Sequence, residues 1–358
     1  MSSPHSLREA ETLVVNLHRR YAGVAATMRA LVPIQQGMRN TAFLDRGSMG
    51  LDGTLTFGEV LREGWTSPPG RSRRIWHARR PTGQILGLFF KYILRQPWEL
   101  VYTVDSPRRH GFFWRVVVNR SSAIITGSER SASYLDWHTR VVPHGVDVAE
   151  FSPPTDKRIA WKEGGLPGKY GIGNFGRIRP DKGTDIFVAA MCEVLPRFPD
   201  FTAVITGLCK PSHHDFRDGL LRQVENAGLK DRIVFLGDLE FEDIKRWYQR
   251  VSLCVAVPRS EGFGLTPLEA MASGAAALTS SEGYFPKILV PGMNGDIVPT
   301  GDAQALHCAL EGLLDDPEAL LRMGEQARRY VVENHSITRE AEGIHAVYDA
   351  VLDEVSPS

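Results

Sequence analysis

The feature that most constrains the fold is a repeated alternation of short apolar runs with longer amphipathic segments. In the second half of the chain, helix-like segments separate five such runs, at residues 170–176, 201–207, 232–237, 253–258 and 275–280. The first half repeats the pattern at residues 12–17, 99–104, 122–128 and 139–142. Parallel strands that are covered on both faces are continuously apolar, and only crossovers can join them. The sequence therefore predicts two doubly wound α/β domains.

The length and a Pro- and Gly-rich segment indicate where the chain divides. A chain of 358 residues is too long for one ordinary core. Residues 151–170 contain Pro153, Pro154 and Pro167 together with several glycines, which interrupt regular structure. We expect a first domain at residues 1–155, a second at 156–335, and a terminal helix at 336–358 that packs back on the first domain. This helix is predicted from apolar residues at helical spacing.

The charge is distributed unevenly between the two halves. The whole chain has 42 basic and 42 acidic residues. Residues 1–156 hold 20 Lys and Arg against 13 Asp and Glu, a net charge of +7, and the remaining 22 and 29 give −7. All basic residues of the first part except Lys91 are arginines. This asymmetry indicates that the first domain binds something anionic.

The sequence favours a cytoplasmic protein. The first 15 residues carry charges where a signal peptide is apolar, and the longest apolar run, residues 85–94, is interrupted by Gly87 and Lys91. The four cysteines form no CxxC pair, which is consistent with a reducing compartment. Residues 85–90 are apolar and have cations on both sides, so they fit either a membrane interface or a core helix with a basic solvated face.

Residues 171–176 match the GxGxxG pattern of a dinucleotide-binding turn. Such a turn opens a helix, but here Pro180 follows closely and disfavours a helix interior. The context therefore argues against a dinucleotide site. The next residues are more informative, because Arg177 and Lys182 lie in a Gly-flanked turn directly after a predicted strand. Two cations at the carboxyl edge of a parallel sheet suit a diphosphate, although a solvated surface turn is the alternative.

The segment after the predicted strand at residues 253–258 is the strongest motif. The backbone amides of Gly262, Phe263 and Gly264 precede a helix and could bind an anion. Glu261 lies in the loop, where a carboxylate can accept hydrogen bonds from sugar hydroxyls. Glu269 lies about one turn inside the helix and could reach a ribose. The alternative is a helix with ordinary acidic residues.

Together these motifs resemble the retaining glycosyltransferases of family 4. That resemblance implies the GT-B fold, in which a cleft separates two Rossmann-like domains. It covers most of the chain and extends to the His144–Asp147 segment, Asn294-Gly295 and Gly301-Asp302. Tyr21–Val24 partly matches the glycine-rich loop of the family's first domain, and His110 is the nearest histidine after the strand at residues 99–104.

The resemblance assigns roles to individual residues. The implied catalytic residues are Glu261, Arg177, Lys182 and His110, and the implied donor-binding residues are Gly23, Arg177, Lys182, Glu261, Gly262, Phe263, Gly264, Leu265 and Glu269. Arg177 and Lys182 would hold the donor diphosphate and stabilise the charge that develops on it. Glu261 would contact the donor sugar and Glu269 the ribose. Because the sequence contains no Asp-x-Asp pair, we expect no metal and no cofactor other than the nucleotide-sugar substrate.

The stereochemical route follows from the resemblance too. A double displacement needs a carboxylate nucleophile, and none stands out in the first half of the chain. The family instead implies a front-face substitution in which the leaving phosphate oxygen takes the acceptor proton. The protein would then supply charge stabilisation, positioning and exclusion of water.

The arginines of the first domain are the candidate acceptor site. We expect Arg79, Arg80, Arg108 and Arg109 to bind an acidic group, because guanidinium forks suit carboxylates and phosphates. The segments around these arginines and His144–Asp147 resemble lipopolysaccharide core mannosyltransferases. That implies GDP-mannose as donor and an anionic lipid-linked acceptor, with peripheral contact at the cytoplasmic face of the inner membrane.

The sequence leaves three alternatives to this function open. The donor could be a UDP- or ADP-sugar, since the base and the hexose are not evident from these residues. A sugar-nucleotide epimerase uses the same fold for a different reaction. A non-catalytic nucleotide- or nucleic-acid-binding module could use the basic half, but that half lacks interleaved aromatic residues and a helix-turn-helix signature, so no nucleic acid partner is expected.

Overall fold

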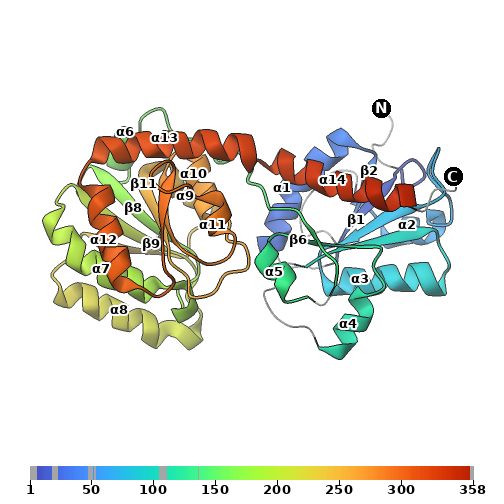
Figure 1. Ribbon diagram of the computed structural model, residues 1–358, viewed down its shortest axis with the longest axis horizontal. Coiled ribbons are helices and arrows are strands. Elements are labelled where there is room, and N and C mark those ends of the chain that lie inside the picture. The colour runs from blue at the N-terminus through green and yellow to red at the C-terminus, as the bar shows by residue number, and fades with distance from the viewer. Residues whose placement is uncertain are drawn as a thin grey trace. The chain divides into compact units, whose positions relative to one another are not determined.

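The chain folds into two compact units. The computed structural model describes residues 6–17, 23–46, 51, 54–104, 111–135 and 137–354 (Figure 1). The first unit spans Met1–His144 and Ile337–Ser358, and the second spans Gly145–Ser336. Each is an α/β unit built on a parallel sheet, as the apolar runs predict.

The first unit has a seven-stranded parallel sheet in the order β3-β2-β1-β4-β5-β6-β7. Its strands are β1 (Thr12–Asn16), β2 (Thr41–Asp45), β3 (Thr54–Leu55), β4 (Arg74–Ala78), β5 (Trp98–Thr103), β6 (Ala123–Thr126) and β7 (Arg140–Val141). The strand order reverses between β1 and β4, so this is a doubly wound sheet.

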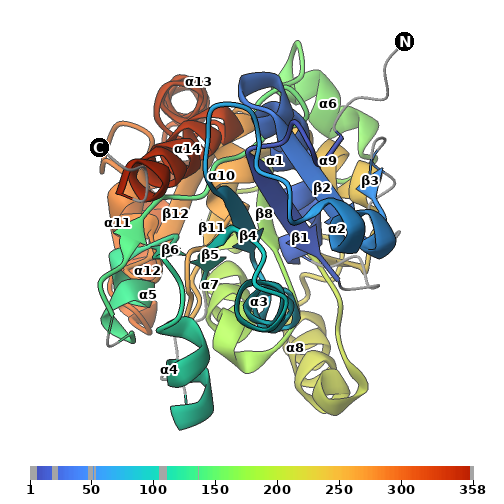
Figure 2. The ribbon, with the colours of Figure 1, turned by 90° about the vertical axis from the view of Figure 1, so that its right-hand side faces the viewer.

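Helices cover both faces of this sheet. They are α1 (Gly23–Met38), α2 (Phe57–Glu63), α3 (Pro81–Leu88), the π-helix η1 (Phe89–Ile93), α4 (Phe112–Val118), α5 (Glu129–Ser133) and α14 (Ile337–Glu354). Figure 2 shows α1 and α14 on one face and α3 and α4 on the other. The core follows the alternation of each strand, because Ile75 and Val101 face α14 whereas Trp76 and Leu100 face η1 and α4.

The last helix belongs to the first unit. Its buried residues Ile344 and Tyr348 pack against β4 and β5. The Tyr348 hydroxyl lies 2.6 Å from Nδ1 of His77, whose Nε2 lies 2.7 Å from Oγ1 of Thr103. This buried polar chain ties the C-terminal helix to the centre of the first sheet.

The chain enters the second unit earlier than the Pro- and Gly-rich segment indicates. The division lies at His144–Gly145 rather than after residue 155, because Val146 pairs with Ser336 and Phe151 packs into the core of the second unit. The chain returns to the first unit at Ile337. Within the Pro- and Gly-rich segment lies a short helix, α6 (Lys157–Glu163), whose first amides donate to the Asp156 side chain.

The second unit has a six-stranded parallel sheet in the order β10-β9-β8-β11-β12-β13. Its strands are β8 (Tyr170–Phe175), β9 (Phe201–Thr206), β10 (Ile233–Gly237), β11 (Val251–Ala256), β12 (Ala276–Ser280) and β13 (Gly295–Val298). The five predicted runs correspond to β8 to β12.

The helices of the second unit also form two layers (Figure 1). Besides α6 they are α7 (Thr184–Val194), α8 (His214–Asn226), α9 (Phe241–Arg250), α10 (Thr266–Ala272), α11 (Phe285–Ile288), α12 (Ala303–Leu314) and α13 (Pro317–Asn334), with the 3-10 turns η2 (Pro180–Lys182), η3 (Leu195–Arg197) and η4 (Pro211–His213). Leu253 packs with α7 and α12, whereas its neighbour Cys254 packs with α9, α10 and α13. Within the described ranges, no helix combines the length and apolar character needed to cross a bilayer.

Candidate active site

The candidate site lies where the strand order of the second sheet reverses. β8 and β11 are neighbours, but β8 continues to β9 on one side and β11 to β12 on the other. The loops after β8 and β11 therefore diverge, and they leave a crevice at the carboxyl ends of the strands. The two loops carry the predicted donor-binding residues of this unit except Glu269, which lies on α10.

The first loop runs from Gly176 through η2 to α7. Gly183 ends η2 with φ 72°, and a Cβ there would lie 1.9 Å from the carbonyl oxygen of Val257. Only glycine allows this left-handed turn to lie against the end of β11. The close approach brings Lys182 beside the second loop.

The second loop joins the first through an ion pair. Lys182 Nζ donates to Glu261 Oε2 at 2.5 Å, and both side chains are about one-fifth exposed. The other carboxylate oxygen of Glu261 accepts from the backbone amide of Gly262 at 3.0 Å. The structure thus brings Glu261 and Lys182 together, and the Gly262 amide, expected to bind an anion, is bonded to Glu261.

Arg177 differs from Lys182. Its side chain is exposed, and within the part of the chain that the structure describes it has no hydrogen-bond or ion-pair partner. A guanidinium at the carboxyl edge of a sheet is suitably placed for an incoming diphosphate.

Close packing fixes the glycine turn at residues 262–264. Gly264 has φ 92°, and a Cβ there would lie 2.2 Å from the ring of Phe285. Phe263 is buried and stacks on Tyr284, with ring centroids 4.9 Å apart. Leu265, the last residue of the predicted donor-binding run, is half-buried just before α10. Phe263 is therefore a packing residue that holds the turn.

Glu269 is half-buried on α10, and Tyr248 on α9 donates to its Oε2 at 2.7 Å. Burial raises the pKa of Glu269, and the hydrogen bond from Tyr248 partly offsets this effect. Tyr248 is itself held by Phe175 at the end of β8, with ring centroids 4.2 Å apart. Tyr248 thus occupies Oε2 of Glu269, and the ribose contact of this carboxylate stays a prediction.

A second bridge, which the sequence did not predict, joins the loop after β11 to the start of α7. The guanidinium of Arg259 binds Asp185 as a fork, with Nη1–Oδ1 at 2.8 Å and Nη2–Oδ2 at 2.7 Å. The Arg259 amide also donates to the carbonyl of Asp181. Burial alone would raise the pKa of the Asp185 carboxyl, but the hydrogen bonds and the charge of the Arg259 guanidinium lower it below its ordinary value. Arg259 and Asp185 are 74 residues apart in the sequence, so no local pattern indicates this contact.

A cavity lies between the two loops. It is lined by Asn174, Phe175, Gly176, Arg177, Lys182, Thr184, Ala256, Pro258, Glu261, Gly264, Thr266 and Phe285. Asn174 donates to the carbonyl of Val255 and so joins β8 to β11 at its base. The predicted residues Arg177, Lys182 and Glu261 all line this cavity.

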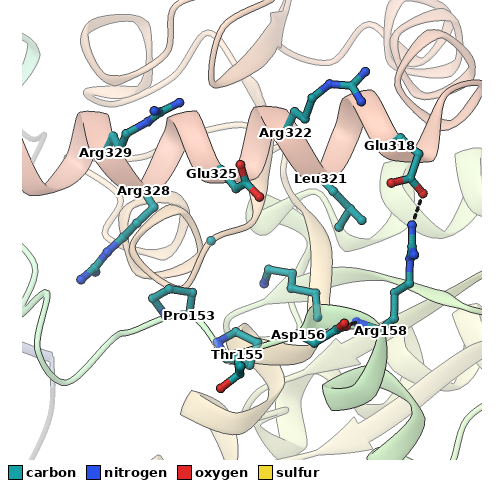
Figure 3. A pocket seen from close by; sticks show the side chains of 13 residues that line it. Pro153, Thr155, Asp156, Arg158, Glu318, Leu321, Arg322, Glu325, Arg328 and Arg329 are labelled. Atoms are coloured by element: carbon teal, nitrogen blue, oxygen red, sulfur yellow. Dashed lines mark hydrogen bonds and ion pairs between the residues drawn. The ribbon is translucent and has the colours of Figure 1, made fainter.

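A larger cavity of about 490 Å³ lies elsewhere in the second unit (Figure 3). It is bounded by the segment before α6, by Gly274 before β12 and by one side of α13, which places it at the amino edge of the sheet. Arg158 and Glu318 form an ion pair across it. Arg328 donates to the carbonyls of Phe151 and Ala272 at 2.8 Å. Arg328 thus holds the segment by which the chain enters the second unit. This cavity is separate from the crevice at the carboxyl ends of β8 and β11.

The predicted residues of the first unit are placed differently. Gly23 begins α1. Arg79 is buried, and its Nη2 donates to Glu340 Oε1 at 3.0 Å. Nδ1 of His144 lies 3.0 Å from the same oxygen. This buried cluster favours a structural role for Arg79. Arg80 is half-buried just before α3. The other predictions here, Arg108, Arg109 and His110, lie outside the described residues.

The described residues contain no group of three or more His, Cys, Asp and Glu side chains with the arrangement of a metal site. Metal independence stays a prediction.

Comparison with known proteins identifies the family. The family profile described as "Glycosyl transferases group 1" matches residues 156–330, which include both loops. The chain is 40% identical over 350 residues to the lipopolysaccharide core biosynthesis mannosyltransferase LpcC of Rhizobium leguminosarum bv. viciae, covering 97% of this chain and 98% of that protein. It is 36% identical to LpsB of Rhizobium meliloti (strain 1021), which bears the same description, over 97% and 99%.

The fold comparison agrees with this assignment. The crystal structure of Anabaena HepE in complex with UDP and glucose matches with a TM-score of 0.72 at 19% identity, covering 96% of this chain and all of that one. The two parallel sheets with helices on both faces form the GT-B fold. The chain belongs to the group 1 glycosyltransferases.

Proposed function

We propose that this glycosyltransferase transfers mannose from GDP-mannose to an anionic, lipid-linked acceptor of the lipopolysaccharide inner core. The observation that carries the proposal is the similarity to two proteins described as lipopolysaccharide core mannosyltransferases over nearly the whole chain, acceptor half included. The net charge of +7 in residues 1–156 supports an acidic acceptor, because a basic surface attracts it. The acceptor's lipid would place the enzyme at the cytoplasmic face of the inner membrane as a peripheral protein.

The two loops of the candidate site would bind the donor in three parts. The ribose hydroxyls would donate to Glu269, whose orientation is held by Tyr248. The diphosphate would take Arg177, which is exposed and unpaired among the described residues, and Lys182, which would leave Glu261. Glu261, released from Lys182, would accept hydrogen bonds from the hexose hydroxyls.

The chemistry would then be a front-face displacement. The bond between C1 of mannose and the β-phosphate oxygen breaks, C1 bonds to the acceptor oxygen, and the acceptor proton passes to the leaving phosphate. The leaving GDP carries more charge than the bound donor, so Arg177 and Lys182 stabilise the transition state more than the ground state. The same two cations supply this stabilisation without a metal, which is the basis of the proposed metal independence.

A calorimetric titration tests the donor. The protein, in EDTA, is titrated with GDP, UDP, ADP and their mannose, glucose and galactose conjugates. Selective binding of GDP and GDP-mannose is the expected result. Preference for a UDP- or ADP-sugar would replace the donor but keep the transferase chemistry. Dependence of binding on added Mg²⁺ would contradict the proposed metal independence.

A further inference from the structure

The helical segment formed by α3 and η1 packs Phe90 into the core of the first unit, but it also carries a second set of bulky apolar side chains that lies outside the core. Ile85, Phe89, Tyr92 and Ile93 are 44%, 43%, 47% and 68% exposed. Their spacing of four, seven and eight residues places them on one helical face. Exposed apolar side chains are common singly, but four on consecutive turns form a continuous surface.

The sheet-facing side of α3 consists of small and polar residues. Gly83, Gln84 and Gly87 face the sheet. A Cβ on Gly87 would lie 2.6 Å from Nε1 of Trp76, so the helix can approach the sheet only where it has no side chain. On α3 small residues thus face the sheet, while on η1 Phe90 fills the core side, and the four exposed apolar residues lie outside. Packing within the unit does not account for the exposed face.

Helix α4 extends this surface. Phe112, Phe113 and Val116 are 83%, 64% and 42% exposed, whereas Val117 and Val118 are buried. α3 and α4 pack together on the same side of the sheet (Figure 2). The guanidinium of Arg120, just after α4, lies 5.8 Å from the ring centroid of Tyr92 on η1. We call the joint surface the aromatic face; its members are Ile85, Phe89, Tyr92, Ile93, Phe112, Phe113 and Val116.

The charged residues of the two segments that carry the aromatic face all have one sign. Residues 81–96 and 111–121 contain no Asp or Glu, and their charged residues are Lys91, Arg95, Arg115 and Arg120. Lys91 pairs with the buried Glu99 at 2.7 Å, and the three arginines are exposed. Exposed aromatic side chains together with exposed arginines on the same segments match the interface of an anionic bilayer, where rings insert at the headgroup level and arginines bind lipid phosphates.

We propose that the aromatic face docks the enzyme on an anionic membrane surface, with Phe112 and Phe113 as the inserting side chains. This inference rests on the proposed function only in that a lipid-linked acceptor gives the docking a purpose. The surface belongs to the first unit, which also carries the basic excess of the chain. Docking there would hold that unit at the lipid headgroups from which an acceptor projects.

Vesicle sedimentation with the full chain tests the proposal. We expect binding to vesicles of phosphatidylcholine with about 30 mol% phosphatidylglycerol, weaker binding to phosphatidylcholine alone, and release by salt. The variant Phe112→Ser/Phe113→Ser should lower the partition coefficient by about tenfold or more, because two exposed aromatic rings no longer insert. Arg120→Glu should weaken binding to anionic vesicles only.

Matched controls separate docking from general effects. Ile159→Ser removes a side chain that is 61% exposed in the second unit, and Lys230→Glu reverses an exposed charge there. Both control variants should bind vesicles as the wild type does. Wild-type binding by the Phe112→Ser/Phe113→Ser variant would overturn the proposal. So would a wild type that ignores anionic vesicles but self-associates through residues 112 and 113, as measured by sedimentation velocity.

Two acceptors distinguish this proposal from the proposed function. With a deacylated, water-soluble acceptor the Phe112→Ser/Phe113→Ser variant should transfer sugar at the wild-type rate. With acceptor embedded in vesicles it should be slower by about tenfold. Equal rates on embedded acceptor would contradict docking. Vesicle binding by a wild type that transfers sugar to neither acceptor would support docking and count against the transferase assignment alone.

Discussion

Lys182 and Glu261 neutralise each other across the candidate active site, with Nζ 2.5 Å from Oε2. One residue comes from the turn after β8 and the other from the loop after β11. Because the proposed donor needs the cation at its diphosphate and the carboxylate at its sugar, donor binding would replace this ion pair with two separate contacts. The pair therefore keeps the two charges compensated until a nucleotide sugar arrives.

Glu261→Gln should separate binding from turnover. The substitution removes the partner of Lys182, so GDP affinity should stay equal or rise slightly, because the amine is free for the diphosphate. Transfer should fall by about 100-fold, the range found when one transition-state contact is lost. Calorimetry with GDP and initial rates with GDP-mannose measure the two effects. Unchanged turnover would remove Glu261 from the site.

Arg177→Ala should weaken GDP and GDP-mannose alike. Loss of a charge-assisted contact to the diphosphate should raise both dissociation constants by about tenfold to 100-fold. The matched control is Arg179→Ala, since Arg179 lies in the same turn but pairs with Asp181 at 2.7 Å. That variant should bind both ligands nearly as the wild type does. Equal losses in the two variants would show a general effect of the turn.

Glu269→Gln should weaken GDP binding and raise the stability of the fold at neutral pH. Burial raises the pKa of Glu269 above its ordinary value, so the folded state holds the proton more tightly than the unfolded state. Its contribution to stability is present at low pH and is lost as the pH rises through the folded pKa. The Gln variant should therefore have a higher Tm than the wild type at neutral pH, with a difference that vanishes in acid. GDP affinity should fall.

Tyr248→Phe tests whether Tyr248 orients Glu269 for the ribose. Removing the hydroxyl deletes the 2.7 Å hydrogen bond but keeps the ring against Phe175. We expect a weaker preference for GDP over 2′,3′-dideoxy-GDP, and the acid limb of GDP binding should move to higher pH, because the bond that lowers the pKa of Glu269 is gone. An undiminished preference for the ribose hydroxyls would leave Tyr248 with a packing role only.

Glu340→Gln should destabilise the first unit strongly. Glu340 Oε1 accepts from Arg79 and lies 3.0 Å from His144, and removing its charge leaves the buried Arg79 uncompensated. The expected loss is about 3–5 kcal/mol in the free energy of unfolding. The control is Glu318→Gln, which breaks the exposed pair with Arg158 and should cost no more than about 1 kcal/mol. Similar losses in chemical denaturation would contradict this account.

The strands that could be predicted from the sequence are those with continuous apolar runs. β8, β9, β11 and β12 are buried on both faces, so their composition alone indicates parallel strands. β4 was not predicted, because Arg74 and His77 interrupt its apolar pattern. Both are buried and have polar partners within the unit: Arg74 Nε donates to the carbonyl of Ala10, and His77 bonds Tyr348 and Thr103. Such partners are far away in sequence and leave no local pattern.

The candidate site shows the same division. Arg177, Lys182, Glu261 and Glu269 follow strands that were predicted, so their place at one sheet edge could be deduced. The pairings within the site could not, because Lys182–Glu261, Arg259–Asp185 and Tyr248–Glu269 join different loops and helices through tertiary packing. Arg79 was predicted to bind the acceptor, because the sequence does not show that Glu340 on α14, far along the chain, pairs with it in a buried site.

The most direct test of the account is the product of transfer itself. The wild-type enzyme, in EDTA, is incubated with GDP-mannose and a deacylated inner-core acceptor, and the product is examined by NMR. The account predicts one mannose added to the acidic core oligosaccharide with the anomeric configuration of the donor. An inverted anomeric centre, or release of free mannose or an epimerised nucleotide sugar without acceptor product, would contradict it.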